Sequence, residues 1–193
     1  MMASSERKRI VLVHPRGFNW FPGKRDITDI ANRMVPQGLL SIAAYLLRAG
    51  QEVIVYDALG PGAPLDLQTQ TRDILAHRPM IVGFSATTSS FPDAADLAAL
   101  IKQQSPQIVT VCGGVHVSAL GGKLLSDYPQ FDFLIPGEGE ETLTELAAGE
   151  NPERIRGLIW HDGERIVANE SRPQIPELDV LPFPAYDKLN GFP

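Results

Sequence analysis

Short apolar runs alternate along the chain with segments in which apolar residues recur every three or four positions. Runs rich in Ile, Val, Leu and Phe predict five β-strands, at residues 10–14, 52–57, 80–85, 108–112 and 133–135. Nearly continuous apolar strands are typical of parallel sheets that are covered by helices on both faces. Their alternation with helical patterns indicates repeated βαβ units. We therefore expect an α/β fold of the Rossmann-like (flavodoxin-like) kind, with a five-stranded parallel sheet and helices on both faces.

Helical patterns follow each of these strands. The first helix is expected to begin at Pro36, whose fixed φ suits the first helical position, and to end at Gly50. Ser89 and Ser90 are candidate caps for the third helix. The remaining helices are expected at residues 65–77, 92–104 and 118–127 and from Gly139 onward.

The pattern changes after Gly149. Two apolar runs, 158–161 and 165–168, flank Asp162-Gly163-Glu164, and this turn signal predicts a C-terminal β-hairpin. A proline-rich tail follows, which indicates a linker or an extended strap over another surface. We therefore divide the chain into a Rossmann-like domain, residues 1–149, and a hairpin with a linker, residues 150–193.

Composition narrows the classes of function. The 193 residues are 44% hydrophobic and 21% charged, as in a soluble globular protein. A net charge of −6 does not provide the clustered Lys and Arg that nucleic-acid phosphates require, so we expect no nucleic-acid partner. The apolar run near the N-terminus is too short for a signal peptide or a membrane span. We expect a cytoplasmic protein.

The chain has a single cysteine, Cys112. One thiol forms no internal disulfide and cannot hold an iron–sulfur cluster, which needs several thiolates. Radical chemistry that depends on such a cluster is therefore excluded for this chain alone. At the end of an apolar strand, Cys112 is predicted to be a small buried residue.

Small residues gather where the predicted strands end. Ser85-Ala86-Thr87-Thr88 follow the third strand, Gly113-Gly114-Val115-His116 the fourth, and Gly137-Glu138-Gly139 the fifth. At the carboxyl edge of a parallel sheet, small side chains let a bulky ligand approach the backbone. The motifs therefore predict a ligand site at this edge, although two adjacent glycines are also typical of a tight turn.

Together these motifs resemble the cobalamin-binding N-terminal domain of B12-dependent radical SAM enzymes, which include methyltransferases and the anaerobic Mg-protoporphyrin ester cyclases. Related corrinoid domains, of the methionine synthase type, carry Ser-x-Leu and Gly-Gly, and Thr87 departs from that leucine. The resemblance implies cobalamin as the cofactor, with its nucleotide tail in a channel that only small side chains can line. The residues that it assigns to cofactor binding at these motifs are Ser85, Thr87, Thr88, Gly113, Gly114, Val115, His116, Gly137, Glu138 and Gly139.

The methionine synthase type also places a cobalt-binding histidine in an Asp-x-His-x-x-Gly motif. In the equivalent stretch here only the final glycine, Gly38, remains, and Val35 stands at the histidine position. We therefore expect cobalamin without protein histidine or its own base on cobalt, and Trp20, Met34 and Val35 on its lower face. His14, in His-x-x-Gly at the end of the first strand, is an alternative ligand; the competing interpretation is a histidine hydrogen-bonded at a strand end.

The tail at residues 175–187 resembles the connector that leads into a radical SAM barrel in this family. The Cys-x3-Cys-x2-Cys loop of that barrel is absent, so we expect the front part of a longer enzyme or a truncated product. S-adenosylmethionine and a 4Fe-4S cluster would belong to that C-terminal radical SAM domain, the expected partner in cis.

The resemblance implies that this chain binds and orients cobalamin, most simply for methyl transfer from methylcobalamin to a substrate radical. Ring formation, as in the Mg-protoporphyrin ester cyclases, is one alternative. A non-catalytic sensor or scaffold that has lost the cofactor is another, because a fold alone does not establish a function. A nucleotide-dependent enzyme is disfavoured because the chain has neither a Gly-x-Gly-x-x-Gly motif nor a P-loop.

Overall fold

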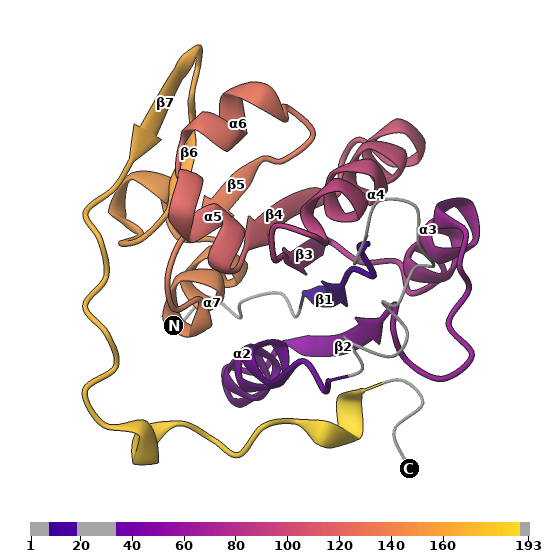
Figure 1. The fold of residues 1–193 in the computed structure, drawn as a ribbon. Helices are drawn as coiled ribbons and strands as arrows, with labels where there is room; N and C mark the ends of the chain where they lie inside the picture. The colour runs from indigo at the N-terminus through magenta and orange to yellow at the C-terminus, as the bar shows by residue number, and fades with distance from the viewer. Residues whose placement is uncertain (1–7, 19–33, 190–193) are drawn as a thin grey trace.

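A computed structural model describes residues 8–18 and 34–189 and shows a parallel β-sheet with helices on both faces (Figure 1). The order of its first five strands is β2-β1-β3-β4-β5, and all of their pairings are parallel. The predicted α/β, flavodoxin-like fold is therefore confirmed. These strands are β1 (Arg9–His14), β2 (Glu52–Asp57), β3 (Ile81–Ser85), β4 (Val109–Gly113) and β5 (Phe133–Ile135).

The C-terminal hairpin extends this sheet instead of standing apart from it. Its strands are β6 (Ile159–Asp162) and β7 (Arg165–Ala168), and β6 pairs antiparallel with β5, which makes a mixed sheet of seven strands. The reason is burial, since Leu158 and Ile159 are only 0% and 5% exposed. Pairing with β5 removes an apolar run from water.

The helices lie on the sheet in two groups. On one face, α2 and α7 share a core with Ile10 and Leu12 of β1; on the other, α3, α4, α5 and α6 share a core with Val11 and Val13. Successive strand side chains point to opposite faces, so one strand supplies both cores. The helices are α2 (Gln37–Arg48), α3 (Leu67–Ala76), α4 (Phe91–Gln104), α5 (Val115–Leu120), α6 (Lys123–Asp127) and α7 (Glu140–Ala148). Among the described residues, no helix combines the length and apolarity needed to cross a membrane.

Two local predictions about helices were wrong, and a third, on the cap of α4, was right only in part. The single helix expected at 118–127 is two helices, because Gly121 ends α5 with a φ of 58° that other residues rarely adopt. Pro36 is the N-cap of α2 and not its first helical residue. Ser90 is the N-cap of α4, but its hydroxyl accepts a hydrogen bond from the Thr87 N–H and does not cap the helix.

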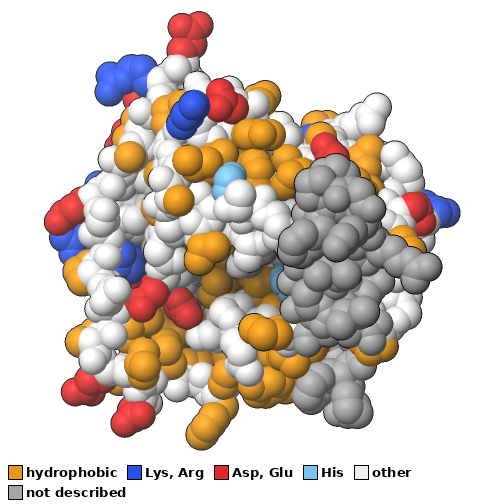
Figure 2. Space-filling view, viewed as in Figure 1, with side chains coloured by type: hydrophobic (Ala, Val, Ile, Leu, Met, Phe, Trp, Pro, Cys, Tyr) orange, Lys and Arg blue, Asp and Glu red, His pale blue; other side chains and the backbone are white. Residues whose placement is uncertain are grey.

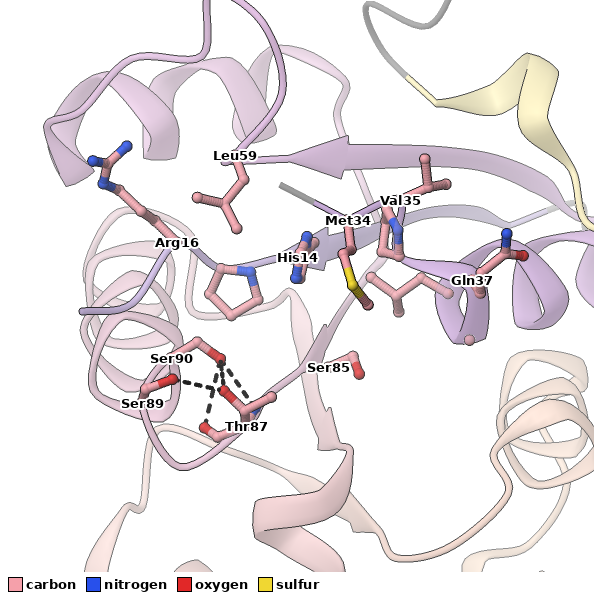
Figure 3. A pocket seen from close by; sticks show the side chains of 14 residues that line it. His14, Arg16, Met34, Val35, Gln37, Leu59, Ser85, Thr87, Ser89 and Ser90 are labelled. Carbon is pink, nitrogen blue, oxygen red and sulfur yellow. Dashed lines mark hydrogen bonds between the residues drawn. The ribbon is translucent and has the colours of Figure 1, made fainter. Parts of the chain in front are cut away.

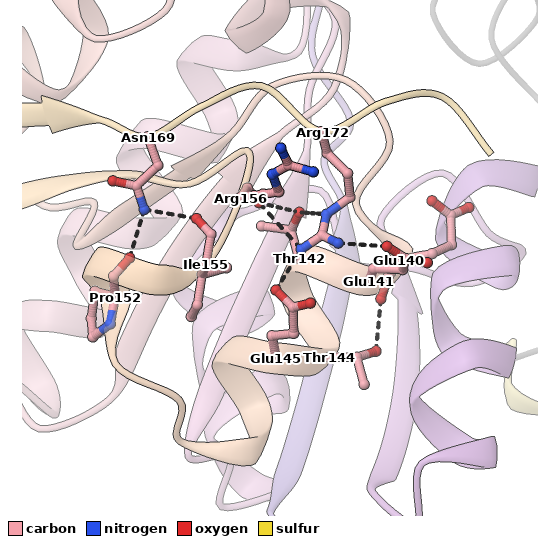
Figure 4. Close-up of polar contacts among 10 residues, drawn as sticks. All are labelled: Glu140, Glu141, Thr142, Thr144, Glu145, Pro152, Ile155, Arg156, Asn169 and Arg172. Carbon is pink, nitrogen blue, oxygen red and sulfur yellow. Dashed lines mark hydrogen bonds and ion pairs between the residues drawn. The ribbon is translucent and has the colours of Figure 1, made fainter.

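The proline-rich tail is an extended strap, here defined as residues 169–189, that crosses α7 and α2 (Figure 1). Arg172 anchors it to α7 through ion pairs with Glu141 and Glu145 (Figure 4). Further along, the Ala185 N–H donates to the Leu40 carbonyl of α2 at 3.1 Å. The sequence left two possibilities for this tail, a linker or a strap, and the described residues form a strap. The strap contains two short 3-10 helices, Leu178–Val180 and Tyr186–Lys188, and a third, Pro152–Arg154, precedes the hairpin.

Candidate functional site

The strands β1 and β3 are neighbours, but the helices that follow them, α2 and α4, pack on opposite faces of the sheet, so the strand order reverses at the carboxyl ends of these two strands. In open parallel sheets, ligands bind at such a reversal of strand order. A cavity of about 460 Å³ opens there (Figure 3), and we name it the switch-point cavity. Its walls are His14, Pro15, Arg16, Met34, Val35, Pro36, Gln37, Gly38, Leu39, Leu59, Ser85, Thr87, Ser89 and Ser90.

Figure 2 shows the molecule from the side of Figure 1, with hydrophobic side chains toward the middle of this face and charged ones mainly near its rim. In the wall of the cavity, Met34 is 74% exposed and Val35 is half-buried, both just before α2. Opposite them, the hydroxyl of Thr87 lies 3.1 Å from those of Ser89 and Ser90 (Figure 3). The cavity therefore has one apolar wall and one hydroxyl-rich wall.

A second, narrower space runs between the sheet and the helices α2 and α7, and we name it the glycine channel. It has a volume of about 50 Å³ and shares Leu39 and Ser85 with the switch-point cavity. The two spaces are therefore neighbours. The channel is lined by Leu12, Leu39, Ile42, Gly83, Phe84, Ser85, Val111, Gly113, Gly114, Ile135, Gly137, Gly139 and Leu143.

Several of these glycines leave space that a side chain would fill. A Cβ atom at Gly113 would lie 3.1 Å from the Ile135 carbonyl oxygen, and one at Gly139 would lie 3.1 Å from Ile42 Cδ1. Ordinary Cβ contacts are longer, so any side chain here would press on the opposite wall. The channel keeps its width because these positions are glycines.

At Gly114 a glycine is required by the backbone conformation more than by the width of the channel. Its φ of 95° and ψ of −179° are accessible almost only to glycine, and a Cβ atom there would lie 2.7 Å from the Ala86 carbonyl oxygen. Two hydrogen bonds fix this crossing: the Ala86 N–H donates to the Gly113 carbonyl, and the His116 N–H donates to the Ala86 carbonyl. The loops that follow β3 and β4 are thereby held together.

His14 lines the switch-point cavity and is held by a carboxylate. Its Nδ1 lies 2.9 Å from Oδ1 of Asp57, which also accepts the Leu59 N–H at 3.0 Å. A carboxylate only accepts hydrogen bonds, so the neutral ring carries its proton on Nδ1. Within residues 8–18 and 34–189, Nε2 has no hydrogen-bond partner. This geometry agrees with a histidine hydrogen-bonded at a strand end, and it equally leaves Nε2 available for the alternative role of a cobalt ligand.

The structure divides the predicted site residues into three groups. Met34, Val35, Gly38, Ser85 and Thr87 line the switch-point cavity, and Ser85, Gly113, Gly114, Gly137 and Gly139 line the glycine channel. Thr88, Val115, His116 and Glu138 line neither space. Trp20 lies outside the described residues.

The four residues outside both spaces have other contacts or face solvent. His116 Nδ1 lies 3.2 Å from Thr88 Oγ1, and its ring lies against that of Phe91 with centroids 4.4 Å apart. Val115 is 67% exposed. Glu138 accepts the Ile175 N–H of the strap at 2.8 Å, so it ties the turn before α7 to the strap.

Sequence reasoning missed several wall residues, of which Gly83 and Ile42 matter most. Gly83 interrupts an otherwise apolar strand, which is a known sign of close backbone approach and could have revealed it. Ile42 is one apolar residue among many on α2. Only the packing of α2 against α7 gives it a place in the channel wall.

Cys112 has the predicted burial, with 0% of its surface exposed, and burial raises the pKa of its thiol from 9.0 to about 12. A shift of this size lowers the thiolate fraction at pH 8 by about a thousandfold, and the thiolate is the reactive form.

We expect iodoacetamide to leave Cys112 unmodified in the native protein and to label it rapidly in urea, as measured by mass spectrometry. Fast labelling without urea would contradict the buried position. Because the pKa is raised, this group's contribution to stability is present below pH 9 and lost as pH rises toward 12.

Comparisons with known proteins agree on one family for this chain. Residues 23–147 match the family model described as B12 binding domain. The chain is 34% identical, over 77% of its length, to an anaerobic magnesium-protoporphyrin IX monomethyl ester cyclase of Synechocystis sp., and 31% identical, over 94%, to an uncharacterized methyltransferase of Pyrococcus horikoshii. It spans 30% and 39%, respectively, of the lengths of these two relatives.

Solved structures show the same fold. A radical S-adenosylmethionine methyltransferase, TsrM from Kitasatospora setae, determined with cobalamin and a 4Fe-4S cluster bound, aligns with a TM-score of 0.70 and 20% identity over 92% of this chain and 31% of its own. The cobalamin-dependent S-adenosylmethionine radical enzyme OxsB, with aqua-cobalamin bound, aligns with a TM-score of 0.75 and 17% identity over 94% of this chain and 24% of its own. At these identities the likeness shows the fold.

Proposed function

The chain belongs to the B12 binding domain family, and on that premise we propose that it binds cobalamin without its own base or a protein histidine on cobalt and presents it to a radical SAM catalytic domain. When bound, cobalamin supplies a cobalt centre that can carry a methyl group. The chain's own residues bind and orient it. The observation that carries the proposal is the contact between the two spaces: the switch-point cavity meets the glycine channel at Leu39 and Ser85.

The residues present fit such a cofactor. The switch-point cavity would hold the corrin ring, with the hydroxyls of Thr87 and Ser89 in reach of its amide side chains and Ser90 holding the Thr87 backbone in place. The nucleotide tail would enter at the glycine channel, which has to widen from the volume of about 50 Å³ that it has in this structure. There, Ser85 offers a hydroxyl that has no hydrogen-bond partner among the described residues and can bond a ring nitrogen.

The lower face of cobalt would meet apolar side chains. Val35 and Met34 precede α2 in the cavity wall. The side chain of Val35 is a hydrocarbon and that of Met34 is a thioether, so neither offers cobalt a nitrogen ligand. His14 is the one imidazole in the described wall, and its bond to Asp57 fixes it at the strand end. A histidine that donates one ring N–H to a carboxylate can still bind a metal through its other nitrogen, so we propose His14 as a wall residue and treat its Nε2 as the alternative cobalt ligand that the titration below tests.

The catalytic partner would be a radical SAM domain in the same polypeptide. In this proposal, residues 1–149 hold the cofactor, and residues 150–193 lead toward that domain even though β6 and β7 extend the same sheet. S-adenosylmethionine and the iron–sulfur cluster would be bound there. Methyl transfer to a substrate radical is our first assignment. Ring formation is the second, favoured by the 34% identity to a magnesium-protoporphyrin ester cyclase.

Titration with hydroxocobalamin tests the proposal. After desalting, we expect about one equivalent of cobalamin to stay with the protein and a visible spectrum without nitrogen ligation. The same spectrum is expected for His14→Gln, because His14 is not assigned to the metal. A nitrogen-ligated spectrum that disappears in His14→Gln would overturn the assignment of Val35. Folded protein that retains no cobalamin would favour a scaffold that has lost the cofactor.

A further inference from the structure

The glycine channel lies between the sheet and two helices, α2 and α7, and it is narrow in this structure. Its volume of about 50 Å³ has room for only a few water molecules. Leu39 and Ile42 of α2 and Leu143 of α7 contribute side chains to its wall. A nucleotide tail is several times larger, and a closely packed interior does not supply that volume by side-chain rotation alone. Entry of the tail therefore requires the helices to move away from the sheet.

The two helices are joined to each other beside the channel. The Ser41 hydroxyl of α2 donates to Oε1 of Glu140, the first residue of α7, at 2.8 Å. Glu140 is only 9% exposed, so separating the helices would leave a buried carboxylate without this bond. We therefore expect α2 and α7 to move as a pair, and a contact that restrains one of them restrains the other.

The strap fixes α7 through one side chain with several partners. Arg172 forms ion pairs with Glu141 and Glu145, and its Nε donates to the Thr142 hydroxyl at 3.1 Å (Figure 4). The Arg172 side chain is only 15% exposed. Salt and water screen a partly buried ion pair less than a surface pair. This anchor is therefore the strongest polar contact between the strap and the helix pair.

The strap also holds the mouth of the channel and α2. The Ile175 N–H donates to the Glu138 carboxylate at 2.8 Å, and Glu138 lies between two glycines of the channel wall. Further along, the Ala185 N–H donates to the Leu40 carbonyl of α2 at 3.1 Å. Outward movement of the helix pair therefore disturbs the contacts with the strap.

Resting on the proposed function, we propose that Arg172 is a positioning residue that holds the glycine channel closed, and that entry of a nucleotide tail releases its anchor on α7. Only the fraction of molecules with a loosened strap is then competent to bind the tail. The apparent affinity is lowered in proportion to that fraction. Weakening the anchor raises the fraction and strengthens binding of a ligand that has a tail.

Two variants separate this anchor from other strap contacts. Arg172→Met removes the ion pairs and keeps an apolar stem, and Glu141 and Glu145 are 41% and 32% exposed, so water can solvate their carboxylates. Arg156→Met is the matched control, because Arg156 pairs with Glu170 of the strap at 2.8 Å. That pair ties the strap to the segment before β6 and not to either helix. Circular dichroism and thermal unfolding establish that both variants fold.

The first measurement is the binding of cobalamin and of cobinamide, which has no nucleotide tail, followed by stopped-flow absorbance and equilibrium titration. We expect Arg172→Met to bind cobalamin about fivefold or more tightly than the wild type, with faster association. Cobinamide binding should change by less than about twofold, because it needs no open channel. Arg156→Met should resemble the wild type with both ligands.

The second measurement is hydrogen exchange in the wild-type chain, which decides the inference even if Arg172→Met is unstable. Cobalamin should speed exchange of the Ile175 N–H by about tenfold or more, and cobinamide should leave it unchanged. The Asn169 N–H is the internal control. It donates to the Leu158 carbonyl at 3.0 Å beside the hairpin and should stay protected with both ligands.

The outcomes distinguish this inference from the proposed function. Cobalamin that binds without any change in exchange at Ile175 would overturn the release of the strap and leave cobalamin binding intact. Equal weakening of both ligands in folded Arg172→Met would show that Arg172 only supports the fold, which also overturns the inference. Folded wild-type protein that binds neither corrinoid would contradict the proposed function itself.

Discussion

Replacing Gly114 by alanine is expected to destabilise the protein by more than about 3 kcal/mol, because backbone strain and a steric clash act at the same atom. A φ of 95° with a ψ of −179° is strained for any residue with a side chain. The new Cβ would also lie 2.7 Å from the Ala86 carbonyl oxygen and 2.8 Å from its nitrogen. Both are backbone atoms in the hydrogen-bonded crossing of two loops, so they cannot move away cheaply. Urea denaturation measures the loss.

Gly38→Ala is the matched control. Gly38 lies in the first turn of α2, and a Cβ atom there would meet no other atom within 4 Å. Alanine favours helix over glycine by up to about 1 kcal/mol, so this variant should be as stable as the wild type or slightly more stable. Equal stabilities for Gly114→Ala and the wild type would show that the crossing relaxes. A bulky residue at position 114 is therefore expected to destabilise the fold, so a loss of ligand binding in such a variant would not show where the ligand lies.

The parallel sheet could be predicted from the sequence because its strands are buried on both faces and therefore continuously apolar. The helix at 118–127 was predicted as one piece because its apolar spacing continues through Gly121 and Gly122, although two adjacent glycines are themselves a breaking signal. The hairpin was predicted, but not its pairing with β5. Edge pairing depends on which apolar surface is near, and that is a property of the tertiary structure.

The candidate site was predictable as a set of strand-end motifs but not as two spaces. Ser85 and Thr88 are three residues apart, yet Ser85 lines both spaces and Thr88 turns toward His116. Likewise, Glu138 lies between two channel glycines, and its carboxylate bonds the strap. The direction of a loop side chain depends on turn geometry and on distant partners. The bond between His14 and Asp57 depends on the β1–β2 register, which places these two residues opposite each other.

The glycines around the channel matter for different reasons, and Gly139 is the one that tests ligand binding. Its φ of −102° and ψ of −8° are ordinary for any residue. The atom nearest to a new Cβ is the end of the Ile42 side chain, which can rotate. A side chain at position 139 is therefore compatible with the fold and would fill the space between α2 and the sheet.

Gly139→Leu is expected to weaken cobalamin binding by at least about a hundredfold, equivalent to about 2.7 kcal/mol, while cobinamide binding changes by less than about threefold. The leucine occupies the channel that the nucleotide tail would enter, and cobinamide has no tail. Titration followed by visible absorbance measures both affinities, and thermal unfolding shows whether the variant is folded. Equal weakening of both ligands would place the damage in the switch-point cavity. Unchanged cobalamin binding would mean that the tail lies outside the glycine channel, because a leucine at position 139 would fill the space between α2 and the sheet.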